Sequence, residues 1–349
     1  MRGNTIHSLR SALLFGLAAV LGLFALGALL ASGRDPATLI TIFSTRFLGI
    51  LIEALPFLLL GAITSGLIDS FVLPEDIARL MPRNPVLATL FGTGMGIFFP
   101  VCECGVVPVV RRLYTKGLPL SVGVAFLLAA PVINPIVLAS TYAAFGFGPV
   151  LIGRVAITAA VALITGLLFS VAARTKDALR PDVAALVPVA GGSAEASADD
   201  IIPLTPVIHR PSFGHGMRHA MTAATGDFFD MGRYLVIGSA LAAAMQTFIP
   251  QDTLTALGSG PVLSVLVLQL LAFVISVCST VDAFLALSFV GTFTPGSIMA
   301  FLTFGPMVDI KSTMMFLGVY KPKAVLFLIV IPMLLTFWAG VWINLNLAF

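Results

Sequence analysis

The chain has 349 residues, of which 58% are hydrophobic and 10% are charged, and its mean hydropathy is +1.07. Soluble domains carry about 25% charged residues, so the composition excludes an ordinary soluble domain and indicates a membrane protein with several spans. The formal net charge of +3 is too small to indicate nucleic acid binding.

Nine apolar runs follow one another along the chain, each near or above the ~20 residues that a membrane-spanning helix needs. The first, residues 11–31, is longer than the roughly 7 to 15 residues of a signal-peptide core, which favours a retained transmembrane helix. The others lie at residues 42–68, 86–110, 118–146, 149–173, 227–249, 261–290, 295–318 and 323–347. We therefore expect an all-α polytopic membrane protein.

The most unusual apolar stretch is residues 91–135, which places Cys102, Glu103 and Cys104 inside a hydrophobic run. Pro100, Gly105 and Pro108 interrupt that run, and the string PVINP ends a second one at residues 131–135. Non-helical backbone at membrane depth is tolerated only where it is buried in protein or lines a wet cavity. This stretch is therefore predicted to form the substrate site of a transporter.

A polar segment, residues 174–220, divides the chain. Its low-complexity composition predicts a partly disordered linker between two transmembrane units, residues 41–173 and 221–349, with residues 1–40 as a separate N-terminal helix. It contains His209, His215 and His219, and the last two could share a helix face and bind a metal. An exposed cluster without a ligand is the favoured interpretation.

The two units resemble each other in sequence. The offset between matching residues falls only from 177, for Glu53 and Asp230, to 175, for Asn134 and Asp309. Matching residues in one order at nearly constant spacing indicate a duplicated unit. The other matches are Gly61 with Gly238, Cys102 with Cys278, Pro119 with Pro295, Ser121 with Ser297, and Pro131 with Pro306.

Positive charges then favour one topology. If all nine runs crossed the membrane, either the linker or the loop at Lys321 and Lys323 would lie outside, against the positive-inside bias. If runs 86–110 and 261–290 are re-entrant hairpins, the linker, the N-terminus and these basic residues are all cytoplasmic. The result is seven spans plus two hairpins. Each unit then has three crossings, which predicts two inverted repeats whose re-entrant or broken helices meet near the midplane.

Chemistry-bearing residues gather in the predicted hairpins and breaks. Intramembrane ionisable residues are functional candidates, and thiols bind soft guests. Arg154 is expected to extend toward a lipid headgroup, and Glu53 and Asp230 lie nearer the ends of their runs. Asp309 would pair with Lys311 only if the helix is distorted between them. The predicted substrate-binding residues are Cys102, Glu103, Cys104, Asn134, Cys278, Asp282 and Asp309.

Three strings carry a resemblance to a known family: PVCECGVVPVVRRLYTKGLP, FLLAAPVINPIV and CSTVDAFLALSFVGTFTPGSIMAFLTFGPMVDIK. Over roughly residues 40–345 the chain resembles the ArsP-type permeases, which include organoarsenical efflux permeases and permeases of unassigned substrate. The resemblance implies a multi-pass permease of the bacterial inner membrane.

We therefore expect an efflux permease for a thiophilic small solute, such as a trivalent organoarsenical, working by alternating access with proton coupling. No enzyme activity, cofactor or resident metal is predicted, and the expected partners are the substrate and the lipid bilayer. No nucleotide-hydrolysing module is predicted, so active transport needs an ion gradient or a separate subunit. The alternatives are a membrane thiol-redox enzyme, or a permease for another sulfur or metal species.

Overall fold

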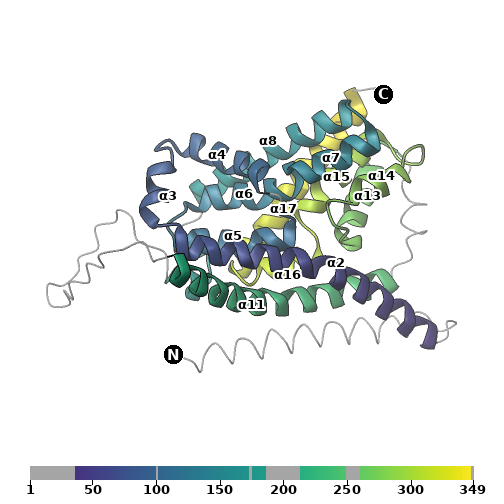
Figure 1. The fold of residues 1–349 in the computed structure, drawn as a ribbon. Coiled ribbons are helices and arrows are strands. Elements are labelled where there is room, and N and C mark those ends of the chain that lie inside the picture. Colours follow the sequence, from purple (N-terminus) through teal and green to yellow (C-terminus); the bar gives the residue numbers. More distant parts are fainter. Residues whose placement is uncertain (1–35, 100, 173–174, 186–212, 249–259, 347–349) are drawn as a thin grey trace.

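The computed structural model describes residues 36–99, 101–172, 175–185, 213–248 and 260–346, which are mainly helical (Figure 1). Within these ranges there is no β-sheet, only isolated bridges between Leu179 and Tyr320 and between Val290 and Phe293. The prediction of an all-α polytopic membrane protein is confirmed. The described helical segments long and apolar enough to cross a membrane are Ala37–Phe71, Leu120–Phe145, Pro149–Ala172, Phe213–Thr247 and Pro322–Asn346.

Two helices of the first half begin with an asparagine N-cap followed by a proline in the first turn. Pro85 and Pro135 occupy first-turn positions, where a missing N–H costs nothing. The Asn84 side chain accepts a hydrogen bond from the Val86 N–H at 3.0 Å, which caps the helix start. The elements are α2 (Pro36–Phe71), α3 (Pro74–Leu80), α4 (Pro85–Phe98), α5 (Glu103–Thr115), α6 (Leu120–Ile133), α7 (Pro135–Phe145) and α8 (Pro149–Ala172).

The second half repeats the mixture of long and interrupted helices. It follows two short helices, α9 (Thr175–Ala178) and α10 (Pro181–Ala184). Its first helix starts inside the segment assigned above to the linker, and most of residues 1–40 and of the linker lie outside the described residues. The elements are α11 (Phe213–Phe248), α13 (Leu263–Ile275), α14 (Asp282–Leu287), α15 (Pro295–Met307), α16 (Ile310–Phe316) and α17 (Pro322–Asn346).

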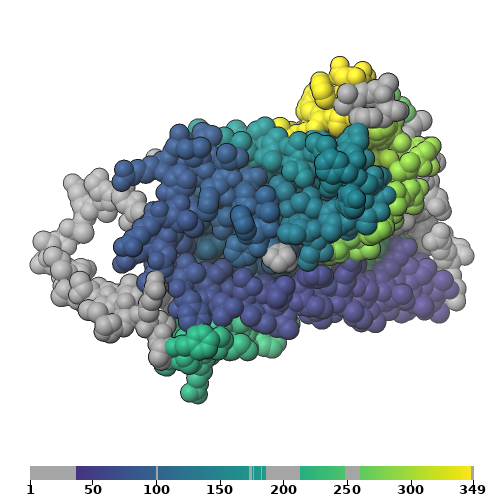
Figure 2. Space-filling model, turned by 45° about the horizontal axis from the view of Figure 1, so that its top comes forward, coloured from purple at the N-terminus to yellow at the C-terminus, as the bar shows by residue number. Residues whose placement is uncertain are grey.

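The longest helices, α2 and α11, lie side by side and antiparallel (Figure 1). Near one end a Cβ added to Gly66 would lie 2.2 Å from the Ala220 carbonyl oxygen, so the two backbones nearly touch. Near the other end the Arg46 guanidinium donates to the Gln246 carbonyl. In Figure 2, α2 forms a long edge of the molecule.

The interrupted segment α4–α5 enters and leaves on one side of the protein. Lys116, which follows α5, donates from Nζ to the Asp69 carbonyl oxygen at 2.7 Å, in the last turn of α2. Because only the short α3 separates α2 from α4, α4 begins near the same end of α2 (Figure 1). The segment 86–110 therefore turns back on itself, as the re-entrant interpretation requires.

The segment α13–α14 also turns back on itself, at the opposite end of the protein from α4–α5 (Figure 1). The Ser264 hydroxyl, in the first turn of α13, lies 2.8 Å from the Thr294 hydroxyl, which precedes α15. The two ends of this segment thus meet on the side where α11 ends. Whether the two halves are related as inverted repeats stays a prediction.

Two further helices are broken at matching places of the two halves. Between α6 and α7, the Asn134 side chain accepts from the Val137 N–H at 2.9 Å. Between α15 and α16, the Asp309 side chain accepts from the Ser312 N–H at 2.6 Å. Both residues are N-caps that satisfy helix ends exposed by the break.

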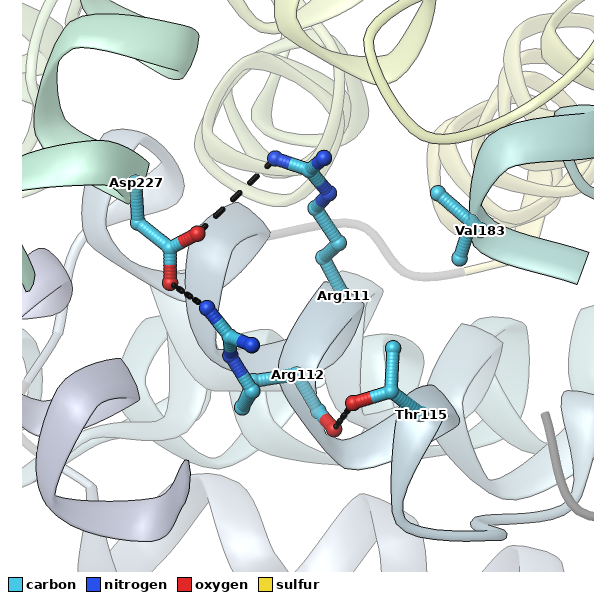
Figure 3. A pocket seen from close by; sticks show the side chains of 5 residues that line it. All are labelled: Arg111, Arg112, Thr115, Val183 and Asp227. Atoms are coloured by element: carbon cyan, nitrogen blue, oxygen red, sulfur yellow. Dashed lines mark hydrogen bonds and ion pairs between the residues drawn. The ribbon is translucent and has the colours of Figure 1, made fainter. Parts of the chain in front are cut away.

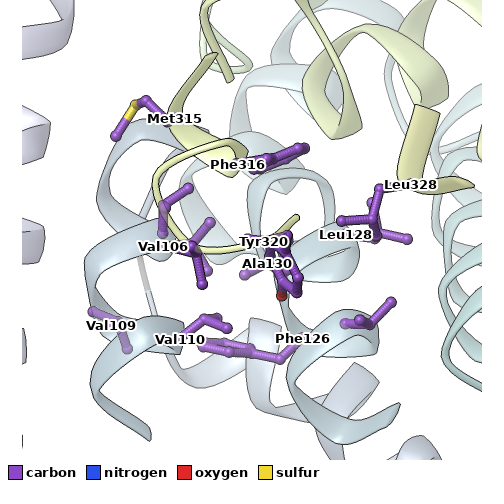
Figure 4. Packing of buried hydrophobic residues seen from close by; sticks show 14 of the residues in the cluster. Val106, Val109, Val110, Phe126, Leu128, Ala130, Met315, Phe316, Tyr320 and Leu328 are labelled. Carbon is purple, nitrogen blue, oxygen red and sulfur yellow. The ribbon is translucent and has the colours of Figure 1, made fainter. Parts of the chain in front are cut away.

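The core joins the two halves around α5 and α6. Figure 4 shows Val106 and Val110 of α5 facing Phe126 of α6, with Phe316 and Tyr320 of the second half packed beside them. All five side chains are buried. Apolar packing therefore keeps α5 and the broken helix α15–α16 together.

Candidate functional site

The backbone breaks bring the three cysteines together. Cys102 is the N-cap of α5, Cys104 lies in its first turn, and Cys278 lies in the break between α13 and α14. All three are buried and free. The Cys102 thiol lies close to those of Cys104 and Cys278, and all three belong to one buried cluster. On a continuous helix, residues two apart do not face each other, but Cys102 is extended, with ψ of 178°, so the thiols can converge.

Small residues allow α2 to cross the start of α5. A Cβ added to Gly61 would lie 2.5 Å from the Gly105 Cα, and one added to Gly105 would lie 2.9 Å from the Phe57 carbonyl oxygen. Any side chain at these glycines would push the two backbones apart. The glycines therefore fix the position of the cysteine-bearing turn against the longest span of the first half.

Charged side chains lie beside the thiols. The Lys311 ammonium lies 2.9 Å from Glu103 Oε1 and 3.4 Å from Asp309 Oδ2, and all three side chains are buried. Lys311 also donates to the Ser276 carbonyl oxygen at 2.9 Å. The break at Asp309 supplies the distortion that the sequence analysis required for its pairing with Lys311, whereas the contact with Glu103 was not foreseen.

Ser276 has an unusual backbone that serves this contact. Its φ of 51° and ψ of 43° place it in the left-handed region, which a non-glycine residue seldom adopts. It ends α13, and its carbonyl oxygen meets the Lys311 ammonium. Ser276, from the second interrupted segment, thus supplies a carbonyl oxygen to the Lys311 ammonium, which also faces Glu103.

The carboxylates of this group are incompletely satisfied. Neither oxygen of Glu103 accepts a well-directed hydrogen bond within the described residues, although Oε1 lies close to Lys311, and Asp309 Oδ2 likewise accepts none. Buried polar groups are normally hydrogen-bonded. These orphaned oxygens differ from those of Asp282, which both accept hydrogen bonds from Arg154, and they make Glu103 and Asp309 candidates for binding a ligand or a proton.

Arg154 corrects the sequence analysis. Its side chain has an exposed fraction of 0% and does not extend toward a headgroup. The guanidinium donates to both carboxylate oxygens of Asp282, at 3.1 and 2.6 Å, and to the Thr141 hydroxyl at 2.8 Å. The expectation failed because Arg154 faces the interior of the protein, where desolvation requires a partner. Asp282 is thereby joined to α8 rather than to the thiols.

Asn134 lies between the cap and the cysteine turn. Besides capping α7, its side-chain amide donates to the Ala130 carbonyl oxygen at 3.0 Å and to that of Val101 at 3.5 Å. The second contact joins the α6–α7 break to the residue before Cys102. Asn134 therefore supports the turn that carries the thiols.

Two charged residues that the sequence analysis ranked lower lie outside this group. Asp230 pairs with Arg111 at 3.4 Å and with Arg233 at 2.8 Å, and its side chain is 42% exposed. Glu53 is half-buried in α2. The expectation that both lie nearer the ends of their runs is wrong, because each lies near the middle of its 36-residue helix.

A second charged cluster lies at the C-terminal end of α5. Figure 3 shows Arg111 and Arg112 of α5 pointing toward Asp227 of α11, with Arg112 Nη2 only 2.9 Å from the carboxylate. Arg112 and Lys116 also lie within 3.5 Å of Asp69 of α2. With Thr115 and Val183 the cluster lines a pocket of about 50 Å³. It binds the end of the first interrupted segment to both long helices.

The larger cavity, about 1280 Å³, holds none of the predicted site residues. It lies where α7 ends and α8 and α15 begin, and its lining is mainly apolar. Among its lining residues are Phe145, Ile298 and Trp342. This cavity and the predicted site residues therefore occupy different parts of the protein.

No metal centre is evident in the part of the chain that the structure describes, where no group of three or more His, Cys, Asp or Glu side chains is placed to hold an ion. His215 and His219 both lie on α11 and are exposed. His219 Nδ1 lies 3.2 Å from the Ser70 hydroxyl instead of facing a second ligand. His209 lies outside the described residues.

Comparisons with known proteins give two relatives and one family. Residues 39–345 match a family described as predicted permease. UPF0718 protein YcgR of Bacillus subtilis is 47% identical over 284 residues, covering 81% of this chain and 90% of the relative. A Streptococcus mutans protein, provisionally named a two-component membrane permease complex subunit, is 37% identical over 290 residues, covering 80% of this chain and 87% of the relative. No solved structure matches.

Proposed function

The chain belongs to the predicted permease family and is a multi-pass membrane protein, and on that premise we propose that it is an inner-membrane efflux permease for trivalent organoarsenicals or similar thiophilic solutes. One observation carries the proposal. Two thiols from one interrupted segment and a third from the other lie in one buried cluster. Structural cysteines that only fill space have no need of this convergence.

The thiols suit a trivalent arsenical that carries one organic group and two hydroxyls. Cys102 and Cys104 would each form an As–S bond while an As–O bond breaks, and each thiol proton would leave with the hydroxyl as water. Arsenic stays trivalent, so no oxidant or reductant is consumed. The product is neutral, which matters because an uncompensated charge is disfavoured in a low-dielectric interior.

Glu103 is the residue placed to move protons during this exchange. It lies between the two cysteines in sequence, and its oxygens are free of well-directed hydrogen bonds. Its carboxylate would accept a thiol proton and return it to the departing hydroxyl, as a general base and then a general acid. Cys278 would form a third bond to arsenic if the solute carries a third exchangeable ligand.

Alternating access would follow from two interrupted segments that enter from opposite sides. We propose that the two halves are inverted repeats, with the N-terminus and the linker in the cytoplasm and proton entry driving export. Support comes from the basic residues near α9 and α10, since positive residues gather on cytoplasmic sides. They are Arg111, Arg112, Arg180 and Lys321, and Lys116 follows at the end of α5 beside Asp69.

Transport of methylarsenite or phenylarsine oxide into inverted membrane vesicles tests this proposal. We expect Cys102→Ser and Cys104→Ser each to reduce accumulation to the level of vesicles without the protein. Thr115→Ser, which keeps its hydroxyl near the end of α5, is the matched control and should transport normally. Membrane levels of each variant are measured in parallel. Normal transport by the Cys102→Ser, Cys104→Ser double variant would refute thiol coordination.

A membrane thiol-redox enzyme is the second candidate, because three free cysteines in one buried cluster would permit a dithiol–disulfide cycle. It predicts a mixed disulfide with a partner, trapped by alkylation and seen by mass spectrometry. A permease for another sulfur or metal species would instead protect a transport-deficient host against that species in a panel of metalloids and sulfur compounds. The name of the Streptococcus mutans relative also favours a partner subunit, which co-purification from native membranes would reveal.

A further inference from the structure

We infer that Glu103 and Asp309 together hold one exchangeable proton, so that the buried group around Lys311 is a proton-binding site. The geometry supplies two carboxylates and one ammonium: Lys311 lies 2.9 Å from Glu103 and 3.4 Å from Asp309. With every group charged, this cluster has a net charge of −1. One proton makes it neutral.

Neutrality is required here because the cluster is removed from water. Glu103, Asp309 and Lys311 are each at most 3% exposed, and an uncompensated buried ion is strongly disfavoured. A proton fits better than a metal ion, since no metal-holding group of side chains occurs among the described residues. The orphaned oxygens of Glu103 and Asp309 are the atoms that would carry it.

The neighbours of the cluster do not supply the missing positive charge. Among the described residues, the titratable groups near Glu103 besides Lys311 and Asp309 are the thiols of Cys102, Cys104 and Cys278. Asp282 lies farther off and is already paired one to one with Arg154. The Ser276 carbonyl oxygen adds a further partial negative charge beside Lys311.

The cluster also spans the two halves of the protein. Glu103 begins α5, Lys311 lies in the first turn of α16, and Ser276 ends α13. A proton that arrives or leaves would therefore change how strongly the first interrupted segment is attracted to the second half. Use of this proton to drive transport rests on the proposed function, but the presence of the proton does not.

Infrared spectroscopy of the purified full-length protein without substrate tests how many protons the Glu103–Asp309–Lys311 cluster holds. The expected number is the number of carboxylates in the cluster minus the number of ammonium groups. At neutral pH the wild type should show one protonated carboxyl band from this cluster that shifts in deuterium oxide. Glu103→Gln and Asp309→Asn should each abolish that band, because one carboxylate then balances one ammonium. Lys311→Met should double it. Asp230→Asn, at an exposed ion pair, is the control and should leave it unchanged.

The inference is overturned if the wild type shows no such band, if the band survives either amide variant, or if sodium in place of choline removes it. The last result would mean that a metal cation fills the site. Thermal stability of the amide variants is measured alongside, and a loss of the band counts only in protein that remains folded. If the band behaves as expected but arsenical uptake is absent, the proton site stands and the proposed substrate does not.

Discussion

Removing the guanidinium of Arg154 should destabilise the protein far more than removing an arginine at its margin. Arg154→Met leaves the Asp282 carboxylate buried without a cation, and it loses two charge-assisted hydrogen bonds of 3.1 and 2.6 Å. At about 1.5–3 kcal/mol for each bond, the loss is roughly 3–6 kcal/mol. This agrees with the roughly 3–5 kcal/mol typical of breaking a buried ion pair.

The matched control is Arg233→Met, which breaks the half-exposed pair with Asp230. Exposed pairs contribute only about 0–1 kcal/mol. The free energy of unfolding of each variant is measured in lipid bicelles by steric trapping. Adding Asp282→Asn to Arg154→Met should recover at least half of the loss, because no unpaired charge remains. Equal losses for Arg154→Met and Arg233→Met, or no recovery in the double variant, would refute the argument.

Two further substitutions test the backbone that supports the thiols. Gly61→Ala should cost about 1–3 kcal/mol by overpacking, because its Cβ would lie 2.5 Å from the Gly105 Cα. Gly49→Ala on the same helix meets nothing within 4 Å and should be near neutral; equal melting temperatures for the two variants would contradict the close approach. Asn134→Ala should cost about 0.5–2 kcal/mol by loss of the cap and should speed alkylation of Cys102 by a membrane-permeant maleimide. Unchanged labelling would show that Asn134 does not support the turn.

Local sequence signals predicted the interrupted segments correctly. The break predicted in the 91–135 stretch is confirmed between α4 and α5, but Gly105 and Pro108, which were expected to interrupt the run, lie inside α5. Asn134 and Asp309 are short polar residues in apolar runs and emerged as N-caps. Helix breaks and N-caps depend on a few neighbouring residues, so they can be predicted from the sequence alone.

The pairing of buried charges could not be predicted in this way. Arg154 and its partner Asp282 are 128 positions apart, and nothing local to Arg154 indicates whether it faces lipid or protein. Lys311 was expected to pair with Asp309 if the helix is distorted between them, and it does so, but its shortest contact with a carboxylate is to Glu103 in the other half. Contacts of this kind depend on how helices are rotated about their axes, which many side chains decide together.

The two cross-half ion pairs differ in their charge balance. Glu103 and Asp282 each begin the helix that follows a break, and each faces a cation from the opposite half. Asp282 is matched one to one by Arg154, with both oxygens bonded, so the second segment is held firmly. Glu103 shares Lys311 with Asp309, so the segment that bears Cys102 and Cys104 lies beside an unbalanced charge. If the proposed proton site is correct, protonation would act on the first segment while the second stays paired, which would make the first segment the moving part.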